Sequence, residues 1–347
     1  YHKMTKKYQI EKNKFGFYQV TPTPSAKEIT KFYADEFYTG EYKNFNDSSL
    51  EVQINDKSFF EGRWNDIYNN FMEINKNIKI GDSILDIGCG WAQALLFFKD
   101  KGLDCYGFDP AIEAVEYGCK KGLNIKHAGL EGMNVFDNKK FDMVTMFNVL
   151  EHLANPEKSI NQIKEILKPN GILAIDVPNE FNDFQTVGRD VHGLNDWWVA
   201  PPNHLNYFSK DSLVNFLENL GFSIEICESS FPLEMFLLFG ENYVKDGKLG
   251  SQCHKKRVKF EENLRKNGKT ETLKNFYRAL ANNSAGNFAL GNWEEIYNAQ
   301  INSIINKRLT VRVRRLVPDL REHPFSRYGI NPRPAQSWFK DVDGARR

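Results

Sequence analysis

Residues 84–92 read ILDIGCGWA and place an acid and two glycines where an apolar strand meets a helix. The first four residues form the strand, and Asp86 is its only charged side chain. Gly88 and Gly90 follow in the turn, where glycine permits a positive φ and lets the backbone approach a ligand closely. The stretch predicts a strand–turn–helix unit that binds a ligand at its turn.

Strand-like and helix-like patterns alternate from Gly81 to Pro178, which is typical of a parallel sheet with helices on both faces. The fourth predicted strand, FDMVTMFNVL, is almost wholly apolar, as a strand buried on both faces should be. Asn155 as N-cap and Pro156 at the first helical position begin the next helix, which Pro169 to Gly171 are expected to end. The predicted fold class is α/β, with a Rossmann-like, doubly wound and mostly parallel sheet.

The predicted organisation has four parts, namely an N-terminal cap segment, the Rossmann-like domain, a helical extension and a tail, at residues 1–80, 81–240, 241–307 and 308–347. The cap segment contains a predicted amphipathic helix around residues 59–74. Residues 179–209 form a long insertion in the domain, and such insertions are usually lids or binding segments. After it we expect a helix over residues 210–220 and strands over residues 222–227 and around Phe236.

The last forty residues differ in composition from the rest. Residues 1–307 hold five arginines, whereas residues 308–347 hold nine arginines and a single lysine, Lys340. So abrupt a change favours vector-encoded or out-of-frame sequence over a natural basic tail. We expect this tail to lie outside the fold.

Composition narrows the function classes. The chain has 46 basic and 45 acidic side chains, so its charge gives no reason to expect nucleic acid or an anionic membrane as partner. It has no run of about 18 apolar residues and no apolar stretch typical of a secretory signal at its start. Its five cysteines are scattered without a CxxC pair, which indicates reduced thiols rather than a zinc or redox site. We expect a soluble cytoplasmic protein with a small-molecule partner, no metal, and an oligomeric state that the sequence leaves open.

A second acid ends the next predicted strand. Asp109 closes DCYGFD, 23 residues after Asp86, where a carboxylate can accept both hydroxyls of a ribose. The acid at Asp86 suits a cationic amino group, such as the one in the methionine half of S-adenosylmethionine. A nicotinamide site is disfavoured because GxGxxG from Gly88 would need glycine where the chain has Gln93. NAD sites share the ribose acid, so this alternative stays open.

Four stretches in order resemble the motifs of class I S-adenosylmethionine-dependent methyltransferases, namely ILDIGCGWA, CYGFDP, FDMVTMFNVLEHLANP and LKPNGILAIDVPN. The similarity is to the branch of ubiquinone-type O-methyltransferases and sugar methyltransferases. It is specific over residues 84–179 and looser over residues 15–240. The resemblance implies methyl transfer to a small molecule, such as a sugar or glycan precursor. Methylation of RNA or protein is one alternative, and the near-neutral charge argues against RNA. Nicotinamide-dependent oxidation is the other, and Gln93 argues against it.

The resemblance also implies a cofactor site. Asp86 and the glycine turn would hold the methionine half, Asp109 the ribose and residues 129–131 the adenine edge, while Asn148 would face the sulfonium. The implied cofactor-binding residues are Asp86, Gly88, Cys89, Gly90, Asp109, Pro110, Leu130, Glu131 and Asn148. Ala92 stands where many relatives have a third glycine. The front segment lacks the zinc-binding cysteines of some sugar C-methyltransferases, so no metal is expected there.

Methyl transfer from a sulfonium is an in-line displacement, in which the protein aligns the nucleophile and excludes water. Two of the seven histidines fall near the predicted site, His152 after the fourth strand and His204 in the insertion. We expect His204 to be the general base, because the insertion overhangs the carboxyl ends of the strands. His152 is the alternative base or shapes the cofactor loop, and Asp176 and Glu151 are alternative acids, with Asp176 favoured because it ends the fifth strand.

The insertion crowds aromatic and rigid residues together, which suits either a lid that stacks on a flat or sugar-like ligand or simple packing onto the sheet. These residues are Trp197, Trp198, Pro201, Pro202, His204, Tyr207 and Phe208.

Overall fold

The computed structural model of the 347-residue chain describes residues 8–25, 28, 49–130 and 132–283. The predicted tail, Glu131 and residues 284–307 of the predicted helical extension lie outside the described residues. Within the described ranges, none of the helices combines the length and apolar character needed to cross a membrane.

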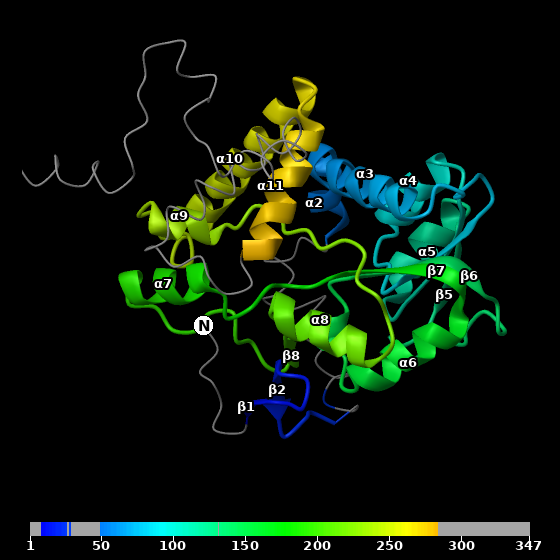
Figure 1. The fold of residues 1–347 in the computed structure, drawn as a ribbon, viewed down its shortest axis with the longest axis horizontal. Helices are drawn as coiled ribbons and strands as arrows, with labels where there is room; N and C mark the ends of the chain where they lie inside the picture. Colours follow the sequence, from blue (N-terminus) through cyan, green and yellow to red (C-terminus); the bar gives the residue numbers. More distant parts are fainter. Residues whose placement is uncertain (1–7, 26–27, 29–48, 131, 284–347) are drawn as a thin grey trace, which may run out of the picture. The chain divides into compact units, whose positions relative to one another are not determined.

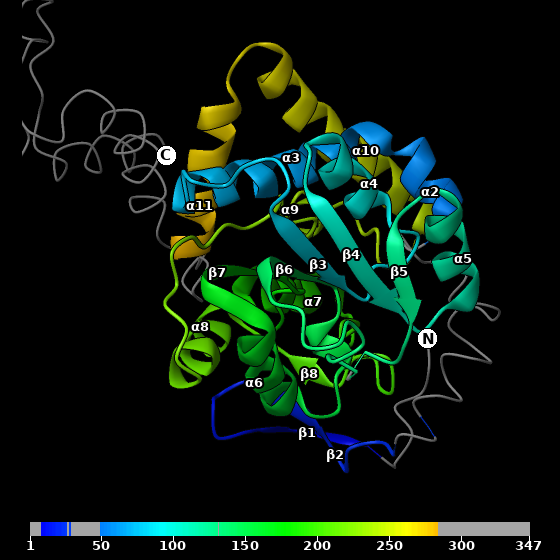
Figure 2. The ribbon, with the colours of Figure 1, turned by 90° about the vertical axis from the view of Figure 1, so that its right-hand side faces the viewer.

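A five-stranded parallel sheet carries the site (Figure 2). Its strand order is β5-β4-β3-β6-β7, and every neighbouring pair is parallel. The strands are β3 (Ser83–Ile87), β4 (Asp104–Asp109), β5 (Asn124–His127), β6 (Phe141–Phe147) and β7 (Leu167–Asp176). The predicted doubly wound α/β fold is confirmed. The order reverses between β3 and β6, and ligands of such sheets bind beside this point, at the carboxyl ends of the strands.

Helices cover both faces of this sheet (Figure 2). Those on one face are α3 (Lys57–Ile74), α4 (Gln93–Asp100) and α5 (Ile112–Lys120), and those on the other are α6 (Pro156–Ile166) and α8 (Lys210–Asn219). Side chains along β3 alternate between the two cores, with Ile84 in the cluster of α3 and α4 and with Leu85 and Ile87 in the cluster of α6 and α8. The N-cap prediction for α6 is confirmed, since the Asn155 side chain accepts a hydrogen bond from the Lys158 backbone N–H.

A second sheet joins the N-terminal residues to the insertion. It consists of β1 (Gln9–Lys12), β2 (Tyr18–Thr21) and β8 (Asn206–Tyr207), in the antiparallel order β1-β2-β8 (Figure 1). The insertion also contains α7 (Asp183–His192). It is therefore a folded part of the protein that pairs with an N-terminal hairpin.

Three local predictions were wrong. Residues 222–227 form no strand, although Phe222 and Ile224 pack against the core beside α8. The apolar segment around Phe236 is a short helix, α9 (Glu234–Leu238), because Leu237 is buried against α7 at Gly188. The residues expected to end α6 lie inside β7 instead, since α6 already ends at Ile166.

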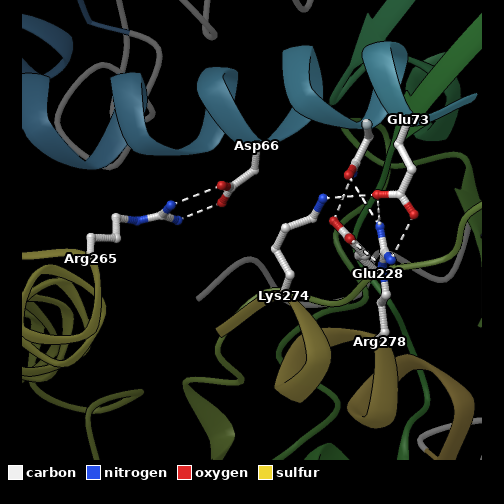
Figure 3. Close-up of polar contacts among 7 residues, drawn as sticks. Asp66, Glu73, Glu228, Arg265, Lys274 and Arg278 are labelled. Atoms are coloured by element: carbon white, nitrogen blue, oxygen red, sulfur yellow. Dashed lines mark hydrogen bonds and ion pairs between the residues drawn. The ribbon is translucent and has the colours of Figure 1, made fainter. Parts of the chain in front are cut away.

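Helix α3 is held from outside by the C-terminal helices. After α2 (Leu50–Asn55), α3 fills the predicted amphipathic segment and lies beside α10 (Gly247–Lys266) and α11 (Thr270–Asn283) in Figures 1 and 2. Figure 3 shows the ion pairs between them, in which Arg265 of α10 binds Asp66 with two hydrogen bonds and Arg278 of α11 binds Glu73 at 2.8 and 2.9 Å. The Arg278 hydrogen bond is the main reason that the pKa of Glu73 falls to about 2.

Two further contacts complete this network. Lys274 donates to Glu73 at 3.1 Å, and Arg278 also donates to Glu228 at 2.8 Å (Figure 3). The network therefore ties α3 both to α11 and to the segment before α9.

Candidate active site

A cavity of about 420 Å³ lies at the carboxyl ends of β3, β4 and β6. Ten of the predicted site residues line this one cavity, namely Asp86, Gly88, Cys89, Gly90, Asp109, Pro110, Leu130, Asn148, His152 and His204. Asp176 is not among the lining residues. The structure thus brings the predicted cofactor residues and both predicted histidines to the same place.

The glycine turn after β3 has the conformation that its sequence predicts. Gly88 has a φ of +69°, and an added Cβ would lie 2.6 Å from the Val149 side chain. Gly90 has a φ of +47° with no atom within 4 Å of an added Cβ. Packing therefore requires glycine at 88, while glycine at 90 leaves open space beside the cavity. Ala92 is buried with a φ of 55°, a conformation that costs an L-residue about 1–2 kcal/mol.

Asp86 presents a buried carboxyl group to the cavity. It is 2% exposed and accepts a 2.7 Å hydrogen bond from the Thr145 hydroxyl of β6. Burial raises the pKa of Asp86 to about 7, with a smaller contribution from the neighbouring charge of Asp109. A cationic group in the cavity would favour the ionised carboxylate and so would bind preferentially to it.

Asp109 links the ends of β3 and β4. One carboxylate oxygen accepts from the Gly90 backbone N–H and the other from the Ala111 N–H, each at 2.8 Å. Burial raises the pKa of Asp109, and these two hydrogen bonds oppose the rise. Because a carboxylate has about four acceptor positions, two remain for a ligand hydroxyl pair.

Asp176 forms an ion pair with an arginine side chain. It ends β7 and forms an ion pair with Arg63, which projects from α3 and lines the cavity. Its backbone carbonyl accepts from the Asn148 N–H at 2.8 Å. The structure thus places Asp176 behind the cavity wall, in contact with Arg63.

Glu151 and His152 lie in a short 3₁₀ helix, η3 (Leu150–His152), directly after β6. Glu151 is 2% exposed, and burial raises its pKa to about 8. The His152 Nε2 atom lies 3.7 Å from Glu151 Oε1, and its Nδ1 atom lies 2.7 Å from the Asn203 carbonyl oxygen. Since a carbonyl only accepts, Nδ1 carries the proton and Nε2 is the unprotonated nitrogen.

His204 comes from the insertion and meets this turn. Its ring lies 5.0 Å from the His152 ring, edge to face, and its Nδ1 atom is 3.7 Å from Glu180 Oε1. Burial lowers the pKa of His152 to about 3 and that of His204 to about 4, with the second histidine adding to the effect at His152. Both imidazoles are therefore neutral near pH 7.

The aromatic residues of the insertion serve packing rather than the cavity. Tyr207 and Phe208 are 1% exposed, and the Phe208 ring packs 4.4 Å from that of Phe17. No tryptophan, tyrosine or phenylalanine of the insertion lines the cavity, which favours packing over the alternative of a stacking lid. The cavity takes its aromatic surface from other elements instead, through Phe60 and Trp64 of α3, Trp91 and Phe147.

Sequence reasoning missed Asn206, which joins three segments at the site. Its amide nitrogen donates to the carbonyls of Leu150 and Leu153, at 3.2 and 2.7 Å, and its oxygen accepts from the Gln19 side chain of β2 at 2.8 Å. The backbone of Leu205 adds a 2.8 Å bond to the Glu151 carbonyl. No sequence signal marks this asparagine. Arg63 was also missed, although arginine is rare before residue 308.

Comparison with known proteins agrees with this geometry. Residues 58–225 match a family model described as a methyltransferase domain. These residues therefore form a methyltransferase domain of the type that uses S-adenosylmethionine as its cofactor.

Three relatives are similar to parts of the chain. The chain is 32% identical over 109 residues to a ubiquinone biosynthesis O-methyltransferase of Glaesserella parasuis serovar 5 (strain SH0165), covering 28% of this chain and 46% of that protein. It is 26% identical over 235 residues to (S)-coclaurine N-methyltransferase of Papaver somniferum, covering 63% of each. It is also 26% identical over 159 residues to a probable (S)-tetrahydroprotoberberine N-methyltransferase 2 of Papaver bracteatum, covering 41% of this chain and 42% of that protein. The matches thus span 42–63% of these relatives' lengths.

Proposed function

We propose that this protein transfers the methyl group of S-adenosylmethionine to a small-molecule acceptor, whose nucleophilic atom enters the cavity beside His152 and His204. The observation that carries the proposal is that one cavity is lined both by the glycine turn with its two acids and by both histidines. A cofactor bound at the turn and an acceptor at the histidines would therefore share one cavity, as an in-line displacement requires.

The two acids support an orientation for the cofactor. The buried Asp86 carboxylate would pair with its amino group, and the remaining acceptor positions of Asp109 would take the ribose hydroxyls. Leu130 would lie along the adenine. In this orientation the methyl group points past Asn148 toward η3.

The proposed reaction forms a bond from the acceptor atom to the methyl carbon as the carbon–sulfur bond breaks. The electron pair of the broken bond stays on sulfur and neutralises the sulfonium. A hydroxyl acceptor loses its proton, which a neutral imidazole at this end of the cavity would take and pass to solvent. We propose His204 for this role, since its Nδ1 atom is buried without a hydrogen-bond partner.

A sugar-like or other polyhydroxylated acceptor is the finer part of the proposal. Two polar atoms at this end, Glu151 Oε2 and His204 Nδ1, are buried without partners and suit ligand hydroxyls. The rings of Phe60 and Trp64 suit the apolar face of a sugar ring.

Calorimetry with S-adenosylmethionine, its demethylated product and NAD tests the cofactor. We expect the first two to bind, whereas tight NAD binding would overturn the proposal in favour of an oxidoreductase. Transfer of labelled methyl to sugars, phenols, amines, RNA and protein then tests the acceptor. Labelling confined to RNA or protein would refute the small-molecule class.

His204→Ala tests the base. We expect kcat on the true acceptor to fall by about 10²–10⁴, with cofactor affinity changed only a few fold. His192→Ala is the matched control, since the His192 ring contacts the Leu237 carbonyl in α9 and does not line the cavity. A kcat unaffected by His204→Ala, with a large loss in His152→Ala, would exchange the two histidine roles.

A further inference from the structure

We propose that Glu151, His152 and His204 bind one divalent transition-metal ion at the acceptor end of the cavity. Each of the three side chains offers one ligand atom, and these atoms all lie within 4.8 Å of one another. Two imidazoles and one carboxylate form a recurrent ligand set for catalytic zinc and related ions. All three residues line the cavity, so an ion held by them would face it.

Two of the three side chains have polar atoms whose bonding is incomplete. Glu151 Oε2 and His204 Nδ1 are both buried without a hydrogen-bond partner. Glu151 as a whole is 2% exposed, so water does not readily replace the missing partner. An unsatisfied buried polar atom costs about 1–3 kcal/mol, and more when it is charged. A bound cation would remove this cost at the carboxylate.

The surroundings of His152 resemble those of a metal ligand. Its Nδ1–H is directed at the Asn203 carbonyl oxygen, 2.7 Å away, which leaves the unprotonated Nε2 on the side of Glu151. Metal-binding histidines usually donate their second ring N–H to a carbonyl or carboxylate in this way, because the bond fixes the tautomer and the ring orientation.

The ligand set selects the ion. Imidazole nitrogens suit zinc, cobalt or ferrous ions, whereas magnesium, calcium and manganese prefer oxygen ligands. Bonds of about 2.0–2.2 Å place neighbouring ligand atoms roughly 3.0–3.5 Å apart, so the side chains must close by about 1 Å when the ion binds. Three protein ligands leave at least one coordination position open, as in catalytic rather than structural sites.

The role of the ion rests on the proposed function. An acceptor hydroxyl bound at the open position would have a lower pKa, so that its oxygen could attack the methyl carbon while the proton leaves to solvent. The ion would then promote loss of the acceptor proton, which is the role proposed for His204 when no ion is bound. From the sequence no metal is expected, because the cysteines form no CxxC pair and the front segment lacks zinc-binding cysteines. His152 and His204 are 52 positions apart and form no local motif.

Cobalt(II) is a suitable probe, because its visible absorption reports bound nitrogen and oxygen ligands. We would titrate Co²⁺ into the chelator-treated full chain and then compete it with Zn²⁺. The expected result is one Co²⁺ per chain, with affinity reduced more than about 100-fold in Glu151→Gln and in His204→Gln. His254→Gln is the matched control, since His254 pairs with Asp56 at 2.5 Å outside the three-residue cluster, and its Co²⁺ affinity should be unchanged.

Two results would overturn the proposal, namely failure of the parent chain to bind Co²⁺ or Zn²⁺ at millimolar concentration, or unchanged Co²⁺ affinity in both cluster variants. Thermal melts identify a variant that has unfolded. In that case the Co²⁺ titrations of the parent chain and of the other variant decide whether the site binds the ion. Calorimetry of the demethylated cofactor with the chelator-treated chain separates this outcome from failure of the proposed function, because cofactor binding at the glycine turn does not need the ion.

Discussion

Asn206→Ala removes the side chain that joins the β2 hairpin, the insertion and η3. Asn206 is 1% exposed, and the substitution removes four hydrogen bonds, of which the one to the Glu151 carbonyl is the longest at 3.4 Å. The three shorter ones measure 2.7, 2.8 and 3.2 Å. At about 1 kcal/mol each, they predict a loss of about 3 kcal/mol in the free energy of unfolding, rising toward 5 if the Leu153 carbonyl stays buried without a donor. Denaturant unfolding of the parent and variant measures this difference.

The same substitution should affect turnover more than cofactor binding. Leu150 and Leu153 flank Glu151 and His152, whereas the hydrogen bonds of the Asn206 side chain go to η3, Leu153 and Gln19 and not to the glycine turn. A displacement of about 1 Å at η3 is expected to lower kcat by up to about 100-fold. Affinity for the demethylated cofactor, measured by calorimetry, should change only a few fold.

Asn219→Ala is the matched control for this experiment. Its amide nitrogen bonds the Asn215 carbonyl one turn earlier on an exposed face of α8, so its loss should change stability by no more than about 0.5 kcal/mol. The reasoning is refuted if Asn206→Ala costs less than about 1 kcal/mol, or if cofactor affinity falls as much as kcat.

The remaining predictions concern the cofactor site and the tail. Burial raises the pKa of Asp86 to about 7, so the fraction of ionised carboxylate, and hence cofactor affinity, should rise between pH 5 and about 7. The Asp86→Asn variant should bind the cofactor weakly and show no such rise. A pH profile in the variant that runs parallel to that of the parent would contradict this assignment. Asp109→Ala should weaken cofactor binding about ten-fold or more, since charged hydrogen bonds contribute about 1.5–3 kcal/mol each, and unchanged affinity by calorimetry would disprove the ribose contact. Deletion of residues 308–347 should leave the melting temperature and cofactor affinity intact, and a collapsed melt would show that the tail is structural.

Local chemistry made the sheet and its glycine turn predictable. The run ILDIGCGWA carries its own turn glycines, and Asn155 with Pro156 marks the start of α6 without reference to the rest of the fold. The segment around Phe236 has no such signal, because a short apolar run fits either a strand or a buried helix. Packing against Gly188 selects the helix, and Gly188 is almost fifty residues away in sequence.

The sequence allowed the residues at the acceptor end of the cavity to be named, but not how they lie relative to one another. His152 could be proposed because it follows the fourth strand, and His204 because the insertion was expected to overhang the carboxyl ends of the strands. Their meeting depends on the bond from Leu205 to the Glu151 carbonyl and on Asn206, which are tertiary contacts. The role of the aromatic insertion stayed open for the same reason, since composition alone does not distinguish rings that pack inward from rings that face a ligand.

Helix α3 makes contacts on two faces. One face lines the cavity through Phe60, Arg63, Trp64 and Ile67, and the other binds α10 and α11 through Asp66, Asn70 and Glu73. The helices that hold α3 lie beyond residues 58–225, the part matched by the family model. Substitutions in α10 or α11 can therefore move one wall of the cavity without altering a residue that lines it. Divergence of acceptor choice among close relatives of this chain should then be sought in residues 247–283 as well as in the methyltransferase domain.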